Sequence, residues 1–142
     1  MKDCLFCKIV AGEIPCAKVF EDGSVLAFLD INPAAKGHTL VIPKKHFETL
    51  AEMPDAELGK LAIAVRDIAK AVVKETKTQG FNVVQSNGTA AEQEIPHVHF
   101  HIVPRFVGDG IGMRWKRAKY SSGAEMAGLA EKILKLTENE RR

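Results

Sequence analysis

The sequence lacks the features that define several large classes of protein. None of its apolar stretches is long enough to cross a bilayer. Twenty Lys and Arg residues against eighteen Asp and Glu residues leave a formal charge of +2, which is too balanced to indicate a nucleic-acid partner or a membrane surface. The segment before the first cysteine contains no signal-peptide core. We therefore expect a cytoplasmic protein that binds neither membranes nor nucleic acid.

Cysteine is also scarce, and three cysteines make a poor disulfide framework. Cys4 and Cys7 form a C-x-x-C pair, which in a reducing compartment indicates metal or redox chemistry. The redox hypothesis requires a thioredoxin-like strand before the motif, and only three residues precede it here. A zinc site would need two further ligands, for which imidazoles are a common choice. Cys16 is expected to pack as a small apolar side chain.

The length of 142 residues suits one domain, and an apolar content of 46% can fill its core. Alternation and turn residues predict strands at 18–21, 25–30, 38–42, 81–86 and 98–104. A short helix is expected at 4–12, and apolar spacings of three and four predict a long helix from Pro54 that ends before Gly80. Met126, Leu129, Ile133 and Leu136 mark a C-terminal helix. This order predicts an α+β fold, an antiparallel sheet with helices packed against it.

The five histidines occur at three places in the chain. His97, His99 and His101 alternate with apolar residues, so a strand would turn all three imidazoles to one face. His38 and His46 bracket the apolar stretch 39–43. The triplet leaves two functional hypotheses open. One is a catalytic zinc held by three histidines. The other is metal-free phosphoryl or nucleotidyl transfer, with one imidazole as the nucleophile.

This pattern resembles the signature of the histidine triad (HIT) superfamily of nucleotide hydrolases and transferases. The resemblance extends to segments 28–33, 36–46 and 80–88, to Gln93 and to Pro104-Arg105, and covers roughly residues 4 to 117. It is greatest to the Hint-like branch in its zinc-bearing prokaryotic form. It implies a single domain over 1–142, with a core at about 4–117 and a C-terminal tail and helix at 118–142. It also implies a five-stranded sheet with two main helices that pairs into a ten-stranded sheet in a homodimer.

The resemblance also implies roles for individual residues. His99 would be the nucleophile that attacks the α-phosphorus of a purine nucleotide, His101 would bind the phosphoryl oxygens, and His38 would lie nearby. Asn87 and Gln93 could add amide donors to the phosphate. Asp30 matches the acid that binds the ribose hydroxyls. The apolar slot for the base matches Ile14, Phe28, Ile31 and Leu40.

In zinc-bearing relatives a C-x-x-C pair shares one metal with two histidines, and Cys4, Cys7, His46 and His97 match that set. Four protein ligands leave no open position, so this zinc would be structural and not required for the chemistry. The alternative is a pair of reduced cysteines without metal. No organic cofactor is expected.

Two departures from the family pattern concern the leaving group. Glu92 stands where many relatives have glycine, and Glu94 stands where the Hint branch often has serine. A carboxylate at position 94 would repel phosphate unless its pKa were raised. In the family the C-terminal region can reach the partner's site, so Trp115, in the basic stretch 114–120, could help to select the leaving group.

The resulting hypothesis is a hydrolase of phosphorus–nitrogen or phosphoanhydride bonds in purine nucleotides, acting through a covalent nucleotidyl-histidine. Its candidate substrates are nucleoside phosphoramidates, adenylylated amines and dinucleoside polyphosphates. Two alternatives are a zinc-dependent hydrolase with the metal on the triad and a non-catalytic nucleotide-binding or scaffold protein.

Overall fold

The computed structural model describes residues 3–112 and 115–142. The chain divides into two compact units, Met1–Ile111 and Gly112–Arg142. The first unit contains a short helix α1 (Leu5–Val10), a long helix α2 (Asp55–Thr76) and five strands. The strands are β1 (Lys18–Glu21), β2 (Val25–Leu29), β3 (Thr39–Pro43), β4 (Gly80–Gln85) and β5 (Phe100–Arg105). Two 3-10 turns, η1 (Leu50–Glu52) and η2 (Thr89–Ala91), lie in the connections.

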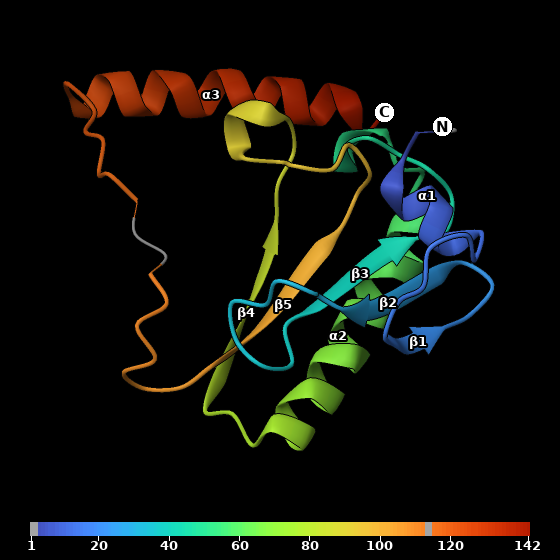
Figure 1. The fold of residues 1–142 in the computed structure, drawn as a ribbon. Coiled ribbons are helices and arrows are strands. Elements are labelled where there is room, and N and C mark those ends of the chain that lie inside the picture. Colours follow the sequence, from blue (N-terminus) through green and yellow to red (C-terminus); the bar gives the residue numbers. More distant parts are fainter. Residues whose placement is uncertain (1–2, 113–114) are drawn as a thin grey trace. The chain divides into compact units, whose positions relative to one another are not determined.

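The five strands form one antiparallel sheet in the order β1-β2-β3-β5-β4 (Figure 1). The turn between β1 and β2 is the predicted one, because the Asp22 carboxylate accepts the backbone N–H groups of Ser24 and Val25 at 2.7 Å each. The expected α+β class and the five-stranded antiparallel sheet with two main helices are confirmed. Pairing of two sheets across a dimer stays a prediction.

Each face of the sheet is covered by a different helix. On one face α2 packs its apolar stripe, including Leu61, Val65 and Ile68, against Val41 and Ile102. On the other face Phe6 of α1 packs with Leu26, Phe28, Leu40 and Ile42. β2 and β3 are therefore buried on both sides, as their nearly continuous apolar sequence requires.

Strand ends differ from the predicted ones by one or two residues. The largest difference in the site is at β5, which begins at Phe100, so His97 and His99 precede the regular ladder. Pairing with β3 starts only at Val41–Phe100, and the Val98 N–H instead donates to the Phe47 carbonyl at 2.8 Å. His38 likewise lies one residue before β3. The triad thus begins in a bend before the ladder, where the His97 N–H donates to the Ile95 carbonyl at 2.8 Å.

The second unit contains α3 (Gly123–Glu140), the predicted C-terminal helix. The Ser122 hydroxyl caps it by accepting the Glu125 N–H at 3.1 Å. Trp115 also belongs to this unit, and Arg114 of the basic stretch lies outside the described residues. None of the helices in the described ranges is both long enough and apolar enough to span a bilayer.

Candidate active site

The triad histidines lie on the sheet face opposite to α2. Val98 and Ile102 are fully buried in the core that α2 covers. On the other face the His99 and His101 rings lie 4.9 Å apart between centroids. Phe6 of α1 lies edge-on to His99, with 5.2 Å between the ring centroids. The predicted alternation of imidazole and apolar side chains is therefore present, and α1 covers part of the imidazole side.

The protonation of His99 follows from its hydrogen bond. Its Nδ1 lies 2.7 Å from the backbone carbonyl oxygen of His97. A carbonyl oxygen can only accept, so Nδ1 carries the proton and donates it. In the neutral ring Nε2 then holds a free lone pair. His99 is held in the tautomer that a nitrogen nucleophile requires.

A second chain of hydrogen bonds sets the tautomer of His101. The Ala34 backbone N–H donates to His38 Nδ1 at 3.0 Å, so the proton of His38 is on Nε2. His38 Nε2 donates in turn to His101 Nδ1 at 2.9 Å. His101 must therefore carry its own proton on Nε2, as a donor. The Asp30 carboxylate lies 3.7 Å from His38 Nε2, beside the second of these hydrogen bonds.

Burial keeps these imidazoles neutral. Burial first, and then the neighbouring His99 and His38, lower the pKa of His101 to about 4 against the opposing effect of Asp30. Burial also lowers the pKa of His38, again against the attraction of Asp30. The two rings therefore act near neutral pH as fixed hydrogen-bond donors rather than as cations.

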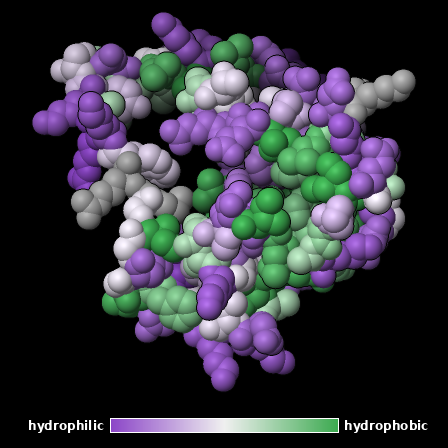
Figure 2. Space-filling model, viewed as in Figure 1, coloured by the Kyte–Doolittle hydropathy of each residue, from purple (hydrophilic) through white to green (hydrophobic). Residues whose placement is uncertain are grey.

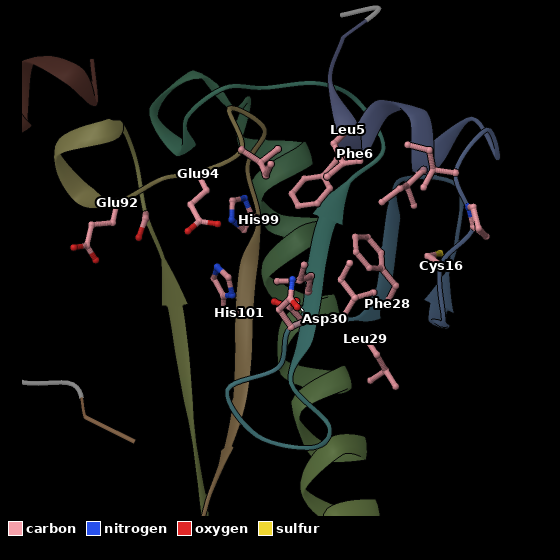
Figure 3. A pocket seen from close by; sticks show the side chains of 18 residues that line it. Leu5, Phe6, Cys16, Phe28, Leu29, Asp30, Glu92, Glu94, His99 and His101 are labelled. Atoms are coloured by element: carbon pink, nitrogen blue, oxygen red, sulfur yellow. Dashed lines mark hydrogen bonds between the residues drawn. The ribbon is translucent and has the colours of Figure 1, made fainter. Parts of the chain in front are cut away.

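His99 and His101 line a cavity of about 400 Å³, here called the histidine cavity. One end is apolar and is formed by side chains of α1, β2 and β3 together with the segment after α1, including Leu5, Phe6, Ile9, Ile14, Phe28 and Leu40. Figure 2 shows apolar surface gathered over α1 and the neighbouring strands. Figure 3 shows the two imidazoles between this apolar end and the segment that carries Glu92 and Glu94.

Five of the residues predicted to hold a nucleoside line the histidine cavity: Ile14, Phe28, Asp30, Ile31 and Leu40. Phe28 and Leu40 are buried, whereas Ile31 is 90% exposed at the rim. The Asp30 carboxylate is fixed at the rim because its Oδ1 accepts the Asn32 N–H at 2.9 Å. The cavity therefore offers an apolar slot beside one carboxylate and two imidazoles.

The structure does not bring Asn87 and Gln93 to the cavity lining. Gln93 Nε2 donates to the carbonyls of Glu48 and Ile95, at 2.7 and 3.1 Å, and its Oε1 accepts the Gly88 N–H at 2.7 Å. Asn87 Oδ1 accepts the Leu50 N–H at 2.7 Å. Both amides thus brace the loop before the triad, and their contact with phosphate stays a prediction.

Sequence reasoning missed part of the cavity wall. Leu5, Phe6 and Ile9 of α1 enter it, as does Ile95 just before the triad. Phe6 and Ile9 follow Leu5 by one and four residues, a spacing that places all three side chains on one face of a helix. This pattern could have predicted that they face the cavity together. Cys16, expected only to pack, also lines the cavity with a free thiol.

Cys4, Cys7, His46 and His97 form a separate cluster, and their four ligand atoms all lie within 4.8 Å of one another. His97 Nε2 donates to the Pro43 carbonyl at 2.8 Å, so its Nδ1 holds the lone pair. That nitrogen lies 3.4 Å from Cys4 Sγ and 3.7 Å from Cys7 Sγ. His46 Nδ1 lies 3.4 Å from Cys7 Sγ.

These separations fit a tetrahedral metal. With Zn–S bonds of about 2.3 Å and Zn–N bonds of about 2.0–2.1 Å, sulfur and nitrogen ligands lie roughly 3.5 Å apart. Burial lowers the pKa of His97 to about 4, so its ring is neutral and able to ligate. The hydrogen bond to Pro43 fixes the ring orientation, as outer partners of metal-binding histidines do. The cluster has the donor set of a closed zinc site.

The nitrogens of the three triad imidazoles do not meet at one point that could hold a shared metal. The free nitrogen of His97 is directed to the cysteines, and Nδ1 of His99 is engaged by a carbonyl. A second group of possible ligands in the described ranges comprises Asp30, His38 and His101. The hydrogen bond between its two histidines accounts for their close approach.

Comparison with known proteins gives consistent results. The HIT domain family model matches residues 11–108. An adenosine 5′-monophosphoramidase of Schizosaccharomyces pombe is 43% identical over 131 residues, which cover 92% of this chain and 95% of that protein. A crystal structure of a HIT family member from Bacillus subtilis has 44% sequence identity and a TM-score of 0.88, covering 94% of this chain and 96% of that one.

A zinc-bound histidine triad family protein from Mycobacterium smegmatis is also similar. It shares 37% sequence identity with a TM-score of 0.74, and the match covers 92% of this chain and 95% of that chain. The structures similar to this chain therefore include a family member with bound zinc.

Proposed function

This chain belongs to the HIT domain family, and from that premise we propose that it hydrolyses purine nucleotides at the α-phosphorus and releases the nucleoside monophosphate. The observation that carries the proposal is the free Nε2 lone pair of His99 in a cavity shaped for a nucleoside. The name of the Schizosaccharomyces pombe relative, a monophosphoramidase, supports a phosphorus–nitrogen bond as the target. Adenylylated amines and dinucleoside polyphosphates are the other candidate substrates.

The reaction runs as two displacements at phosphorus. In the first, His99 Nε2 attacks the α-phosphorus, a P–N bond to the imidazole forms, and the bond to the leaving group breaks. The leaving amine departs with the bonding electron pair and takes up a proton from solvent. In the second, water attacks the phosphorus, gives up a proton, and the electron pair of the P–N bond returns to Nε2. The His97 carbonyl holds the developing imidazolium by its Nδ1–H.

His101 and His38 serve the phosphoryl group. The Nε2–H of His101 donates to a phosphoryl oxygen as charge develops there, and the bond from His38 keeps that proton on Nε2. Asp30 accepts from the ribose hydroxyls, and the apolar end of the cavity takes the base. His99 is thus the nucleophile, and His101 and His38 assist it.

We further propose that Cys4, Cys7, His46 and His97 hold a structural zinc. The donor distances and the zinc-bound relative support this role. When bound, zinc would fasten the start of α1 to the segment before the triad without an open position for substrate. The chemistry is assigned to the imidazoles and does not require the metal.

The proposal includes one HIT domain over 1–142 and a homodimer. The sheet order leaves β4 as an edge strand, and its Phe81 and Val83 are exposed by about half. A second copy added at this edge would form the ten-stranded sheet. A cytoplasmic location is retained as the expectation from the sequence.

The test compares His99→Ala with the wild type on adenosine 5′-phosphoramidate. We expect turnover to fall by at least about a thousandfold while adenosine monophosphate still binds, because only the covalent step is lost. Val98→Ala is the matched control, since it shortens the neighbouring side chain, which faces the α2 core and does not line the cavity. Mass spectrometry of quenched wild-type reactions should locate the nucleotidyl group on His99. Unchanged turnover of His99→Ala would refute the nucleophile assignment.

The same assay separates the alternatives. A hydrolase with its metal on the triad would lose activity on chelation even where circular dichroism shows an intact fold. A non-catalytic nucleotide-binding protein would bind the monophosphate and turn over none of the substrates.

A further inference from the structure

The histidine cavity has an unusual charge for a site that is to hold phosphate. Three carboxylates line it, those of Asp30, Glu92 and Glu94, and no Lys or Arg lies among its described lining residues. The pKa of His101 is lowered by burial, so this ring adds no positive charge near neutral pH. The lining therefore carries negative charge without a compensating cation.

The two glutamates lie at a distinct end of the cavity. Both come from the loop between η2 and β5, whereas the apolar residues come from α1 and the first strands. Figure 3 shows Glu94 pointing toward His99, with Glu92 farther from the apolar end. A nucleotide with its base in the apolar end and its α-phosphorus at His99 would direct the leaving group to the glutamate end.

Neither glutamate is neutralised from within the chain as far as the structure describes it. The ion pairs of these ranges join Lys or Arg side chains to other carboxylates. Asp30 lies 3.7 Å from the neutral His38 ring beside the ribose position, and Glu92 and Glu94 are left facing the leaving group. An anionic leaving group such as a nucleoside polyphosphate would be repelled there, and an ammonium would be attracted.

We propose that Glu92 and Glu94 select substrates whose leaving group carries a positive charge. The substrate class is a nucleoside 5′-phosphoramidate of an amine that bears a second, protonated amino group. This inference rests on the proposed function and deepens it, because it chooses among substrates that the same nucleophile could attack. The glutamates are specificity-determining residues, and the bonds formed and broken are those given above.

The experiment compares two adenosine 5′-phosphoramidates of equal length, one ending in an ammonium and one in a hydroxyl group. Diadenosine tetraphosphate serves as the anionic probe. For the wild type we expect kcat/KM to be about fivefold higher for the ammonium substrate than for the hydroxyl substrate, the upper end of what exposed charge pairs supply. The ratio should fall when the ionic strength is raised from about 0.02 M to about 0.5 M.

The Glu92→Gln/Glu94→Gln double variant should bring that ratio to about one, because the charge that distinguishes the two leaving groups is then absent. It should also raise turnover of diadenosine tetraphosphate. Glu75→Gln is the matched control, because it removes one negative charge from α2 outside the histidine cavity, and it should keep the wild-type ratio.

The outcomes distinguish the leaving-group preference from the hydrolase activity itself. Equal kcat/KM for the two phosphoramidates in the wild type, or a preference that the double variant retains, would overturn the inference while the hydrolase assignment stands. Absence of turnover with all three substrates would refute the proposed function and the inference with it.

Discussion

Gly37 holds the backbone that leads into His38, and replacing it with alanine tests how tightly this part of the site is built. Its φ is +94°, in the left-handed region that favours glycine. A Cβ atom there would lie 2.7 Å from Thr76 Cγ2 of α2 and 3.3 Å from Pro104 Cγ of β5. Carbon atoms in contact normally lie about 3.5–4.0 Å apart. Both the backbone conformation and the packing therefore exclude a side chain.

The expected loss in the free energy of unfolding is the sum of the backbone strain and the steric overlap. A left-handed conformation costs an L-residue about 1–2 kcal/mol, and overpacking a core site costs about 1–3 kcal/mol. Alanine also lowers the entropy of the unfolded chain, which offsets up to about 1 kcal/mol. We expect Gly37→Ala to destabilise the protein by about 3 kcal/mol, or roughly 10 °C in Tm.

Gly108→Ala separates the two effects. Gly108 has a φ of +76°, and a Cβ there would meet no atom within 4 Å, so this variant should lose only about 1 kcal/mol. Urea denaturation followed by circular dichroism gives both values. Because His38 follows Gly37 and donates to His101 at 2.9 Å, Gly37→Ala should also lower kcat, and Gly108→Ala should not.

A double variant tests the clash directly. Thr76→Ser removes Cγ2 but keeps the hydroxyl that donates to the Val72 carbonyl at 2.7 Å. Combined with Gly37→Ala, it should recover about 1 kcal/mol relative to the sum of the single changes. If Gly37→Ala cost no more than Gly108→Ala, or if Thr76→Ser gave no recovery, the packing argument would be wrong.

Three further predictions concern the metal cluster, the buried imidazoles and the end of α2. Cys7→Ser should abolish stoichiometric zinc by elemental analysis and lower stability by about 3 kcal/mol, with turnover per folded molecule retained, whereas Cys16→Ser should keep the metal. The folded-state pKa of His101 is about 4 and its ordinary value is 6.5, so the unfolded chain binds that proton first and stability falls as the pH drops from about 6.5 toward about 4. The full shift corresponds to about 3.4 kcal/mol, and solvent screening of the partly exposed ring reduces the expected loss to about 2 kcal/mol. The unfolding free energy, measured by denaturation at several pH values in this window, should depend less on pH for His101→Asn than for the wild type. An equal dependence on pH would contradict the assignment. Lys77 ends α2 with a φ of +52°, so Lys77→Gly should raise the unfolding free energy by about 1 kcal/mol, while Lys74→Gly within the helix should lower it by a similar amount.

Local patterns in the sequence were enough to predict most of the fold. Alternation, short apolar stretches and turn residues placed all five strands to within two residues, and the apolar spacing from Leu58 to Val72 placed α2. The start of β5 was predicted two residues early, because the histidine–apolar alternation continues through Val98 and His99 while pairing with β3 begins only at Phe100. A side-chain pattern indicates which faces of a segment are buried. It does not indicate where the backbone hydrogen bonds of the ladder begin, because that depends on where the partner strand ends.

The site was predictable in its histidines and less so in its walls. Alternation alone put His99 and His101 on one face, and the family resemblance supplied Asp30 and the apolar residues that the cavity contains. Tautomers could not be read from the sequence, because they depend on the carbonyl of His97 and the N–H of Ala34. Gln93 illustrates the same limit, since its amide is directed by tertiary contacts to the Glu48 carbonyl rather than by its position beside the triad.

The side chain and the backbone carbonyl of His97 have different roles. Its ring lies in the cysteine cluster, while its main-chain oxygen accepts the hydrogen bond that Nδ1 of His99 donates. Every amino acid supplies that oxygen. Descendants of this protein could therefore lose the proposed metal site, and with it the histidine at this position, without losing the hydrogen bond that orients the His99 ring. Loss of the cluster in such lineages would be a neutral path as long as other packing kept the first helix in place.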